Sequence, residues 1–236
     1  MATKKKMLQA AAGQAGGAAL DITDVFSTYL YEGNGSIQTI TNGIDLAGEG
    51  GMVWSKSRTV GDNHRLTDTE RGANKTISTD ATYAEYTNVG VQSATQFNSN
   101  GFVSGLSDPF FNGESLVSWT FRKAPKFFDV VTWTGDGTTN RAIPHGLGTT
   151  VGTIIVKVTS SASDWLVWHR SNSQNAGTAS TDSCILMLNS TEGNGANAYS
   201  EDGEFPTVPT DTNFYVGNNT ANINGVSYVA YLFAHN

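Results

Sequence analysis

Cysteine, proline and charge are all scarce in this chain, and each shortage excludes a class of protein. The single cysteine, Cys184, rules out an intrachain disulfide and a cysteine-rich metal site, and its apolar neighbours predict a buried thiol. Five prolines in 236 residues are too few for a proline-rich disordered chain. No apolar run approaches the roughly 20 residues of a membrane-spanning helix, and no secretory signal is visible. We therefore expect a protein that is made in a cytoplasm, folds there and has no membrane partner.

Basic residues are also few. The chain has 14 Lys and Arg against 21 Asp and Glu, which gives a net charge of −7. Binding to nucleic-acid phosphates requires clustered Lys and Arg, so we expect no nucleic-acid partner. The one basic cluster is at the N-terminus and is followed by two apolar residues; we predict a docking role for this group, with a solvated tail as the alternative: Lys4, Lys5, Lys6, Met7 and Leu8.

Glycine, by contrast, is abundant, with 26 residues, and Thr, Ser and Asn are frequent. This composition is typical of short strands joined by tight turns and is unfavourable for long helices. A chain of 236 residues can form one large all-β domain or two of roughly 100 residues each. We predict an all-β fold.

Residues 1–30 differ in composition from the rest. Ala, Gly, Gln and Lys dominate up to Ala19, and each glycine costs a helix about 1 kcal/mol relative to alanine. We predict an extended N-terminal arm over 1–30 that anchors the protein to a partner, with a capped helix or strand from Asp21. We also expect residues 1–28 to be dispensable for folding.

The chain contains an internal repeat. Residues 112–123 read NGESLVSWTFRK and residues 224–235 read NGVSYVAYLFAH. Both begin with Asn-Gly, continue with apolar and aromatic residues, and have Phe at the tenth position, Phe121 and Phe233. Such nearly continuous apolar runs predict strands buried on both faces. We interpret them as the closing strands of two copies of one fold.

The beginnings of the two copies also match. YEGNG at 31–35 corresponds to WTGDG at 133–137, and Asn-Gly and Asp-Gly are signals for type I′ hairpins. The second copy has about ten extra residues within 171–211. A unit of about 100 residues is the size of a domain and exceeds any solenoid repeat.

These observations predict two tandem β-sandwich modules with a jelly-roll-like fold. The first spans 31–123 and the second spans 131–236, with a linker at 124–130. Because the linker is short, we expect the two modules to touch.

Chemistry-bearing residues form no recognisable motif. The densest polar run is GDNHRLTDTERG at 61–72, whose irregular spacing favours a solvated hairpin over a metal or acid–base site. His145 and His169 follow strands, where we expect turn and capping roles. No nucleophile elbow or phosphate loop is present. We therefore predict no catalytic residue, no metal site and no cofactor, and a protein that is not an enzyme.

Three residues are nevertheless predicted to face a ligand. The chain has five tryptophans, and exposed ones would stack on sugar rings, although tryptophans within strands are core residues by default. Trp133, at the entrance of the WTGDG turn, is the best candidate for partial exposure. His64 and Arg65, in the polar run, are the other two.

The second copy also resembles a known module. Along the chain, the order GNG, HGLG, IIVK, DWLVWHRS, LMLNST, FYVGN and NGVSYVAYLFAHN is similar to a β-rich module of tailed bacteriophages, mainly marine and cyanobacterial ones, and the second copy, 131–236, matches this pattern closely. That module recurs, often in tandem, in tail-fibre-like and other virion structural proteins. The first copy is looser, with TNGIDL in place of HGLG and NHRLTDTERG in place of DWLVWHRS. The resemblance covers about 200 residues; it implies β-sandwich modules and virion assembly, and no reaction.

The resemblance implies a non-enzymatic virion structural protein, made in the host cytoplasm. We expect a tail-fibre or tail-appendage component that docks to other virion proteins through its N-terminal arm and forms a homo-oligomer in the particle. One alternative is a capsid decoration protein, such as a cement, knob or head-fibre subunit. A further alternative is a module that binds a host-surface glycan. The sequence shows no heptad repeat for a long fibre shaft, which keeps the decoration alternative open.

Overall fold

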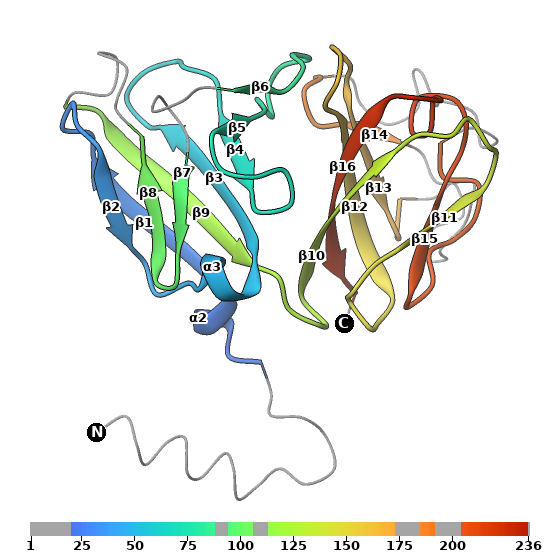
Figure 1. Ribbon diagram of the computed structural model, residues 1–236, viewed down its shortest axis with the longest axis horizontal. Coiled ribbons are helices and arrows are strands. Elements are labelled where there is room, and N and C mark those ends of the chain that lie inside the picture. Colours follow the sequence, from blue (N-terminus) through green and yellow to red (C-terminus); the bar gives the residue numbers. More distant parts are fainter. Residues whose placement is uncertain (1–19, 88–93, 106–112, 173–184, 192–203, 236) are drawn as a thin grey trace, which may run out of the picture.

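The structure, a computed structural model, describes residues 20–87, 94–105, 113–172, 185–191 and 204–235. In these residues the protein is all-β, as the composition predicts, and consists of two β-sandwich units side by side (Figure 1). Its two helices in the described residues are short: α2 (Ile22–Val25) and α3 (Leu46–Glu49). Asp21 caps α2, and its carboxylate accepts a hydrogen bond from the Thr23 amide at 3.0 Å.

The first unit has a four-stranded sheet in the order β1-β9-β3-β4 and a three-stranded sheet in the order β2-β8-β7. A two-stranded pair, β5 and β6, lies beside them. The strands are β1 (Phe26–Glu32), β2 (Gln38–Thr41), β3 (Gly51–Ser57), β4 (Arg65–Asp68), β5 (Lys75–Thr76), β6 (Tyr86–Thr87), β7 (Ala94–Asn98), β8 (Gly101–Ser104) and β9 (Ser115–Arg122).

The second unit has a five-stranded sheet in the order β10-β16-β12-β13-β14 and a two-stranded sheet of β11 and β15. Its strands are β10 (Phe128–Thr134), β11 (Arg141–Pro144), β12 (Val151–Val158), β13 (Trp165–His169), β14 (Leu186–Met187), β15 (Asn213–Val216) and β16 (Ser227–Ala234).

The strand pairing confirms the internal repeat. In each unit the first strand pairs with the last, and the predicted closing strands β9 and β16 occupy the same place in their sheets. Phe26 lies opposite Phe121 in the first unit, and Phe128 lies opposite Phe233 in the second. The second strand of each unit likewise pairs with the penultimate one. This nesting is jelly-roll-like, although β3 and β4 form a simple hairpin within one sheet.

The units begin earlier than the sequence predicts. β1 starts at Phe26, so residues 26–30, assigned to the arm, belong to the first sheet. β10 starts at Phe128, so the predicted linker 124–130 ends inside a strand. In both places the backbone pairs with the closing strand, which a compositional boundary does not reveal.

The predicted hairpins after β1 and β10 are wrong, although the turns are present. The side chains of Asn34 and Asp136 each accept a hydrogen bond at 2.9 Å from the amide two residues later, which makes an Asx turn. Gly35 and Gly137 follow with φ of 71° and 72°. Each turn carries the chain from the larger sheet of its unit to the smaller one, so the flanking strands do not pair.

Each unit has an apolar core between its two sheets. The first is small and includes Ile40, Val53 and Phe102. The second is larger and includes Ile143 and Phe214, the equivalents of Ile40 and Phe102. The alternation of side chains along β9 and β16 directs one set of residues into these cores and the other set to the outer face.

The outer faces of the two large sheets share a third core. The side chains of Met52, Leu66, Phe128, Val229 and Tyr231 are buried there, from both units. The equivalent residues Phe121 and Phe233 pack against this core and against each other, with ring centroids 5.6 Å apart in an edge-on arrangement. The two units therefore touch, as predicted, and they do so through a continuous hydrophobic core.

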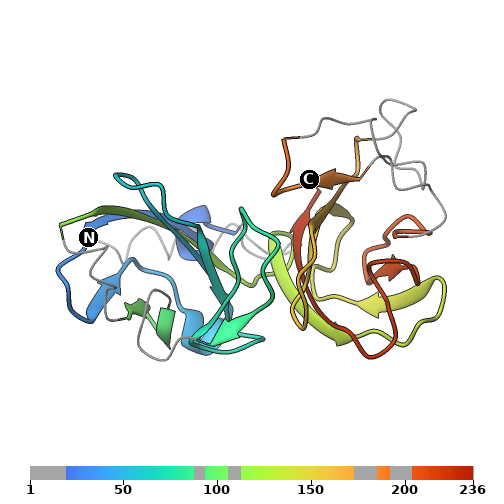
Figure 2. The same cartoon turned by 90° about the horizontal axis from the view of Figure 1, so that it is seen from above.

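A segment of the first unit, residues 75–87, bridges the two units (Figure 2). The Glu85 amide donates to the Thr159 carbonyl at 2.9 Å, and the Ser163 amide donates to the Thr82 carbonyl at 2.9 Å. The Trp165 indole N–H donates to the Ser78 carbonyl at 2.9 Å. These bonds fix the position of one unit on the other.

Candidate functional site

An aromatic patch lies on the outer face of the first sheet, next to the shared core. We define it as Trp54, Trp119 and His64. Trp54 and Trp119 face each other across β3 and β9, with ring centroids 5.9 Å apart in an edge-on arrangement. All three side chains are half-buried, so part of each ring faces solvent. Trp133, Trp165 and Trp168, in the second unit, are buried.

The hydrogen bonding of His64 defines the chemistry of the patch. Its Nδ1 accepts a hydrogen bond from the Trp54 indole N–H at 3.1 Å. Burial lowers the pKa of His64, which favours the neutral ring with its proton on Nε2. Among the described residues, no partner of Nε2 is found, and the same holds for the indole N–H of Trp119. The patch thus offers two N–H donors beside two indole faces.

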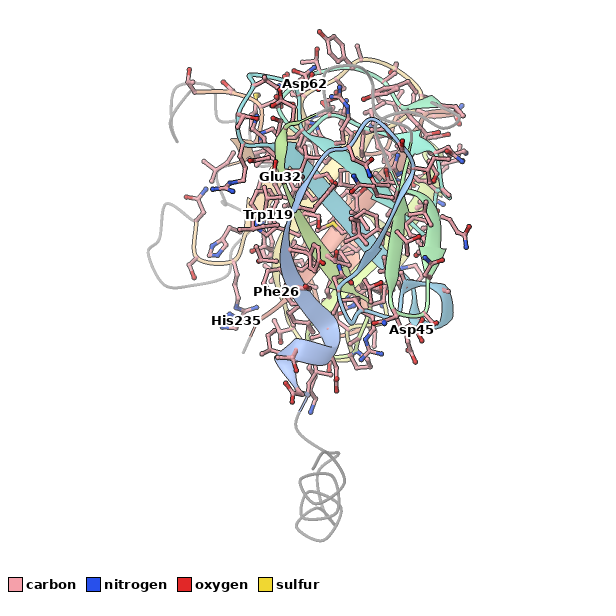
Figure 3. The ribbon with its side chains drawn as sticks, turned by 90° about the vertical axis from the view of Figure 1, so that its left-hand side faces the viewer. Phe26, Glu32, Asp45, Asp62, Trp119 and His235 are labelled. Atoms are coloured by element: carbon pink, nitrogen blue, oxygen red, sulfur yellow. The ribbon has the colours of Figure 1, made fainter. Side chains whose placement is uncertain are left out.

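Residues of β1 extend the patch toward the edge of the sheet. Thr28 lies opposite Trp119 and Leu30 lies opposite Val117, and residues opposite each other share a face. Thr28 and Leu30 are exposed. Figure 3 shows β1 between its labelled ends, Phe26 and Glu32, with Trp119 beside it.

Arg65 has a structural role in this region. Its guanidinium donates to both carboxylate oxygens of Asp62, at 3.3 and 3.1 Å, and to the Asn63 carbonyl at 3.0 Å. These bonds hold the loop between β3 and β4 in place. Arg65 also lines a cavity of about 30 Å³ at the end of the first sandwich, which has room for about two water molecules. Of the predicted pair, His64 is therefore the better placed for a ligand.

The predicted exposure of Trp133 is wrong. Its side chain is only 8% exposed and stacks on Tyr228, with ring centroids 5.0 Å apart. Its indole N–H donates to the Ala221 carbonyl at 3.3 Å. The turn that follows it folds over the core of the second unit, and this covers the ring.

The polar run 61–72 predicts a solvated hairpin, but its central residues, Arg65–Asp68, form the buried strand β4. Leu66 and Asp68 lie at the contact between the two units. Asp68 is fully buried; its Oδ2 accepts hydrogen bonds from Arg71 Nε and from the Tyr231 hydroxyl, both at 2.6 Å. Arg71 also pairs with Glu85 at 3.0 Å. Burial raises the pKa of Tyr231 well above its usual value, so the hydroxyl stays protonated and donates. The network links the two copies, which sequence reasoning missed.

Two further histidines singled out in the sequence, His145 and His169, bond to nearby backbone groups. His145 lies in a turn, where its Nδ1 accepts from the Leu147 amide at 3.3 Å, and the His169 Nδ1 accepts from the Ser171 amide at 3.1 Å. Both therefore bond local backbone, as predicted. The docking residues Lys4, Lys5, Lys6, Met7 and Leu8, and also Cys184, lie outside the described residues.

In the described ranges, no three His, Cys, Asp or Glu side chains gather closely enough to hold a metal ion. None of the helices in that part of the chain has the length and apolar character that crossing a membrane requires.

The fold and the patch define a protein of two repeated β-sandwich units that share a core. The sequence profile of one family, described as a domain of unknown function (DUF7483), matches residues 21–236, and the chain therefore belongs to this family. The match begins at the cap of α2 and spans both units, so the family is defined by the pair. Searches of curated proteins and of solved structures gave no match.

Proposed function

We propose that this protein is a non-enzymatic structural component of a tailed-phage particle, at the tail as a fibre or appendage subunit. The observation that carries the proposal is the shared core: the outer faces of both large sheets, which apolar residues cover in each copy, pack against each other and are buried together. The sequence resemblance of the second copy to virion modules supports it. His64, His145 and His169 bond indole or backbone groups, which are structural roles.

The proposed partners are other virion proteins. The protein is made in the host cytoplasm and becomes part of the virion, where residues 4–8 dock the two packed units to the particle. The alternative position is the head, as a decoration protein. In both positions the two β-sandwich units would be the same, and only the partner of the N-terminal arm would differ.

Quantitative mass spectrometry of purified virions tests this function. A few to a few dozen copies per particle, with antibody labelling at the tail, are expected. Hundreds of copies with labelling on the head would favour the decoration alternative. Virions that lack the protein, produced by cells that express it, would contradict a structural role of either kind. A chain lacking residues 1–19 should fold and fail to join particles.

The aromatic patch favours a second candidate function, which is binding of a host-surface glycan. Indole faces stack on the apolar face of a sugar ring, and the N–H groups of His64 and Trp119 would donate to its hydroxyls. Trp119→Ala should weaken binding to a host polysaccharide by roughly threefold to tenfold. The matched control is Tyr83→Ala, which removes an exposed aromatic residue outside the patch. Equal binding by both variants would exclude the patch as a glycan site.

A further inference from the structure

Strand β1 is an edge strand with an open side. It pairs with β9 on one side, and no described residue pairs with it on the other. The Gly33 amide donates to the Glu114 carbonyl at 2.9 Å, so Gly33 points its backbone toward β9. Because backbone direction alternates along a strand, the N–H and C=O groups of Thr28 and Leu30 point to the open side.

Within the described residues, the backbone groups at the two ends of this open side have hydrogen-bond partners, and those at its centre do not. The Phe26 amide donates to the Ile22 carbonyl of α2. The Glu32 carbonyl accepts from the Gln38 side chain at 3.0 Å. Between them, Thr28 and Leu30 present two amides and two carbonyls for which no described partner is found.

The equivalent edge in the second unit is covered over more of its length. On β10, Phe128 exchanges backbone hydrogen bonds with Ala124 at 3.0 and 3.2 Å. The Val130 carbonyl accepts from Lys123 at 3.4 Å, and the Thr134 carbonyl accepts from Arg141 at 2.6 Å. Val130 of β10 thus has backbone partners at the position where Thr28 of β1 has none among the described residues.

β1 also lacks the features that protect edge strands from pairing. It contains no lysine and no proline, and its register with β9 runs without a bulge. Leu30 is 58% exposed at its centre. Leu20, Ile22 and Ile37, which flank the strand in sequence, are also exposed. An unprotected, partly apolar edge of this length is a template for another strand.

The sequence of β1 is self-complementary. In an antiparallel pair of two copies with the two-fold axis at Tyr29, Thr28 lies opposite the partner's Leu30. In the same register Glu32, the only charged residue of the strand, lies opposite the partner's Phe26 and meets no like charge. The outward backbone groups of both copies then form hydrogen-bonded pairs.

We propose that two copies of this protein associate through β1, antiparallel edge to edge, so that their four-stranded sheets form one continuous sheet. The contact is independent of the position of the protein in a particle. The open edge of β1 would then be the contact surface of the homo-oligomer that the sequence predicts.

Sedimentation equilibrium of the full chain tests the pairing. The wild type should be a dimer, and Leu30→Lys should weaken it by roughly tenfold or more, because a lysine on an edge strand opposes pairing. The matched control is Thr132→Lys, at the equivalent exposed position of β10, which should leave the dimer unchanged. Circular dichroism of each variant verifies the fold.

A cysteine experiment tests the register. In a Cys184→Ser background, Thr28→Cys and Leu30→Cys are made as separate proteins. Opposite residues in a hydrogen-bonded antiparallel pair have Cα atoms about 5.5 Å apart, within the range for a disulfide. Mixed under mild oxidation, the two variants should form a heterodisulfide dimer, and neither should form one efficiently alone.

A wild-type chain that is monomeric at tens of micromolar would overturn the proposal. A dimer that Leu30→Lys leaves intact would also overturn it, and loss of that dimer on deletion of residues 1–19 would assign the contact to the arm. These outcomes are measured on purified protein and leave the proposed virion role untouched.

Discussion

Asp68 places a negative charge at the centre of the contact between the two units. Its carboxylate is fully buried and is compensated by Arg71, which is itself almost inaccessible to solvent, and by the Tyr231 hydroxyl. In such a site, loss of one partner leaves the other charge unpaired and without water. The network is therefore far more sensitive to substitution than an ion pair at the surface.

Asp68→Asn should destabilise the protein by about 3–5 kcal/mol, since it preserves the shape of the side chain and leaves Arg71 partly uncompensated. The control is Asp62→Asn, which removes a partly exposed ion pair with Arg65 and should cost less than about 1 kcal/mol. Urea denaturation followed by fluorescence measures both values. Similar small effects of the two substitutions would mean that the buried network contributes no more than a surface pair.

Lys157 is a second buried charge, and its effect depends on pH. Its ammonium group donates to the carbonyls of Thr82 and Ser163, at 3.1 and 2.7 Å. Burial lowers the pKa of Lys157 from 10.5 to about 8. The unfolded chain therefore binds more protons between pH 8 and 10.5, and the contribution of this group to the free energy of unfolding rises with pH across that window.

The measurement compares wild type with Lys157→Met in urea at pH 7, 8, 9 and 10. Groups common to both proteins cancel in the difference, so only the titration of Lys157 remains. The wild type should gain stability relative to the variant from pH 8 to 10 and show a constant difference below about pH 7. A difference that does not vary with pH would show that Lys157 keeps its ordinary pKa in the folded protein.

The sequence predicts the residues of the aromatic patch and of the buried Asp68 network only in part. Tryptophans at strand positions are core residues by default, and this holds for Trp165 and Trp168. Trp54 and Trp119 lie on an outer face that the other unit covers incompletely, so their partial exposure depends on how the two units pack. The role of Asp68 also depends on how the two units pack, so the sequence does not reveal it. No local pattern reports a contact between side chains about 160 residues apart.

At the scale of the element, β1 is an integral strand of the first sheet, and its bounds decide which truncated chains should fold. Phe26 lies opposite Phe121, and their ring centroids are 4.7 Å apart. Removal of residues 1–28 would leave β1 without Phe26 and would expose one side of β9. The expectation that these residues are dispensable for folding thus conflicts with the strand bounds.

A chain that starts at Leu20 should therefore fold with near wild-type stability, and a chain that starts at Tyr31 should be strongly destabilised or insoluble. The longer form retains α2 and all of β1; the shorter one exposes Phe121 and the open edge of β9. The melting temperatures and solubilities of the two chains measure this difference in stability. If the chain from Tyr31 were as stable as the longer one, β1 would be an accessory strand.

The turns show what local sequence can and cannot predict at this scale. Asn-Gly and Asp-Gly correctly mark the chain reversals after β1 and β10, because Gly35 and Gly137 adopt positive φ. They do not determine the partner of the next strand. β2 pairs with β8, which follows it by about 60 residues, because the apolar face of β2 is buried between the sheets. Pairing over such distances is decided by the whole core.

At the scale of the whole molecule, the repeat predicts two copies of one fold and does not predict that they depend on each other. The signal for a shared core is the apolar character of both faces of the closing strands. On β16, Tyr228, Ala230 and Leu232 are buried in the core of the second unit, and Val229 and Tyr231 are buried against the first. A sheet that is apolar on both faces requires cover on both, and here the other copy provides it.

Because the units share a core, we expect them to unfold together in one transition. Ile40 and Ile143 are equivalent residues in the separate cores of the two units, 4% and 3% exposed. Replacing either by alanine should cost about 2–5 kcal/mol through lost burial and the cavity left behind. If unfolding is cooperative, Ile40→Ala and Ile143→Ala each lower the midpoint of the same single transition. Scanning calorimetry should then give equal calorimetric and van't Hoff enthalpies for all three proteins. Two resolved transitions, with each variant shifting only the one that belongs to its own unit, would show that the shared core and the Asp68 network leave the units thermodynamically independent.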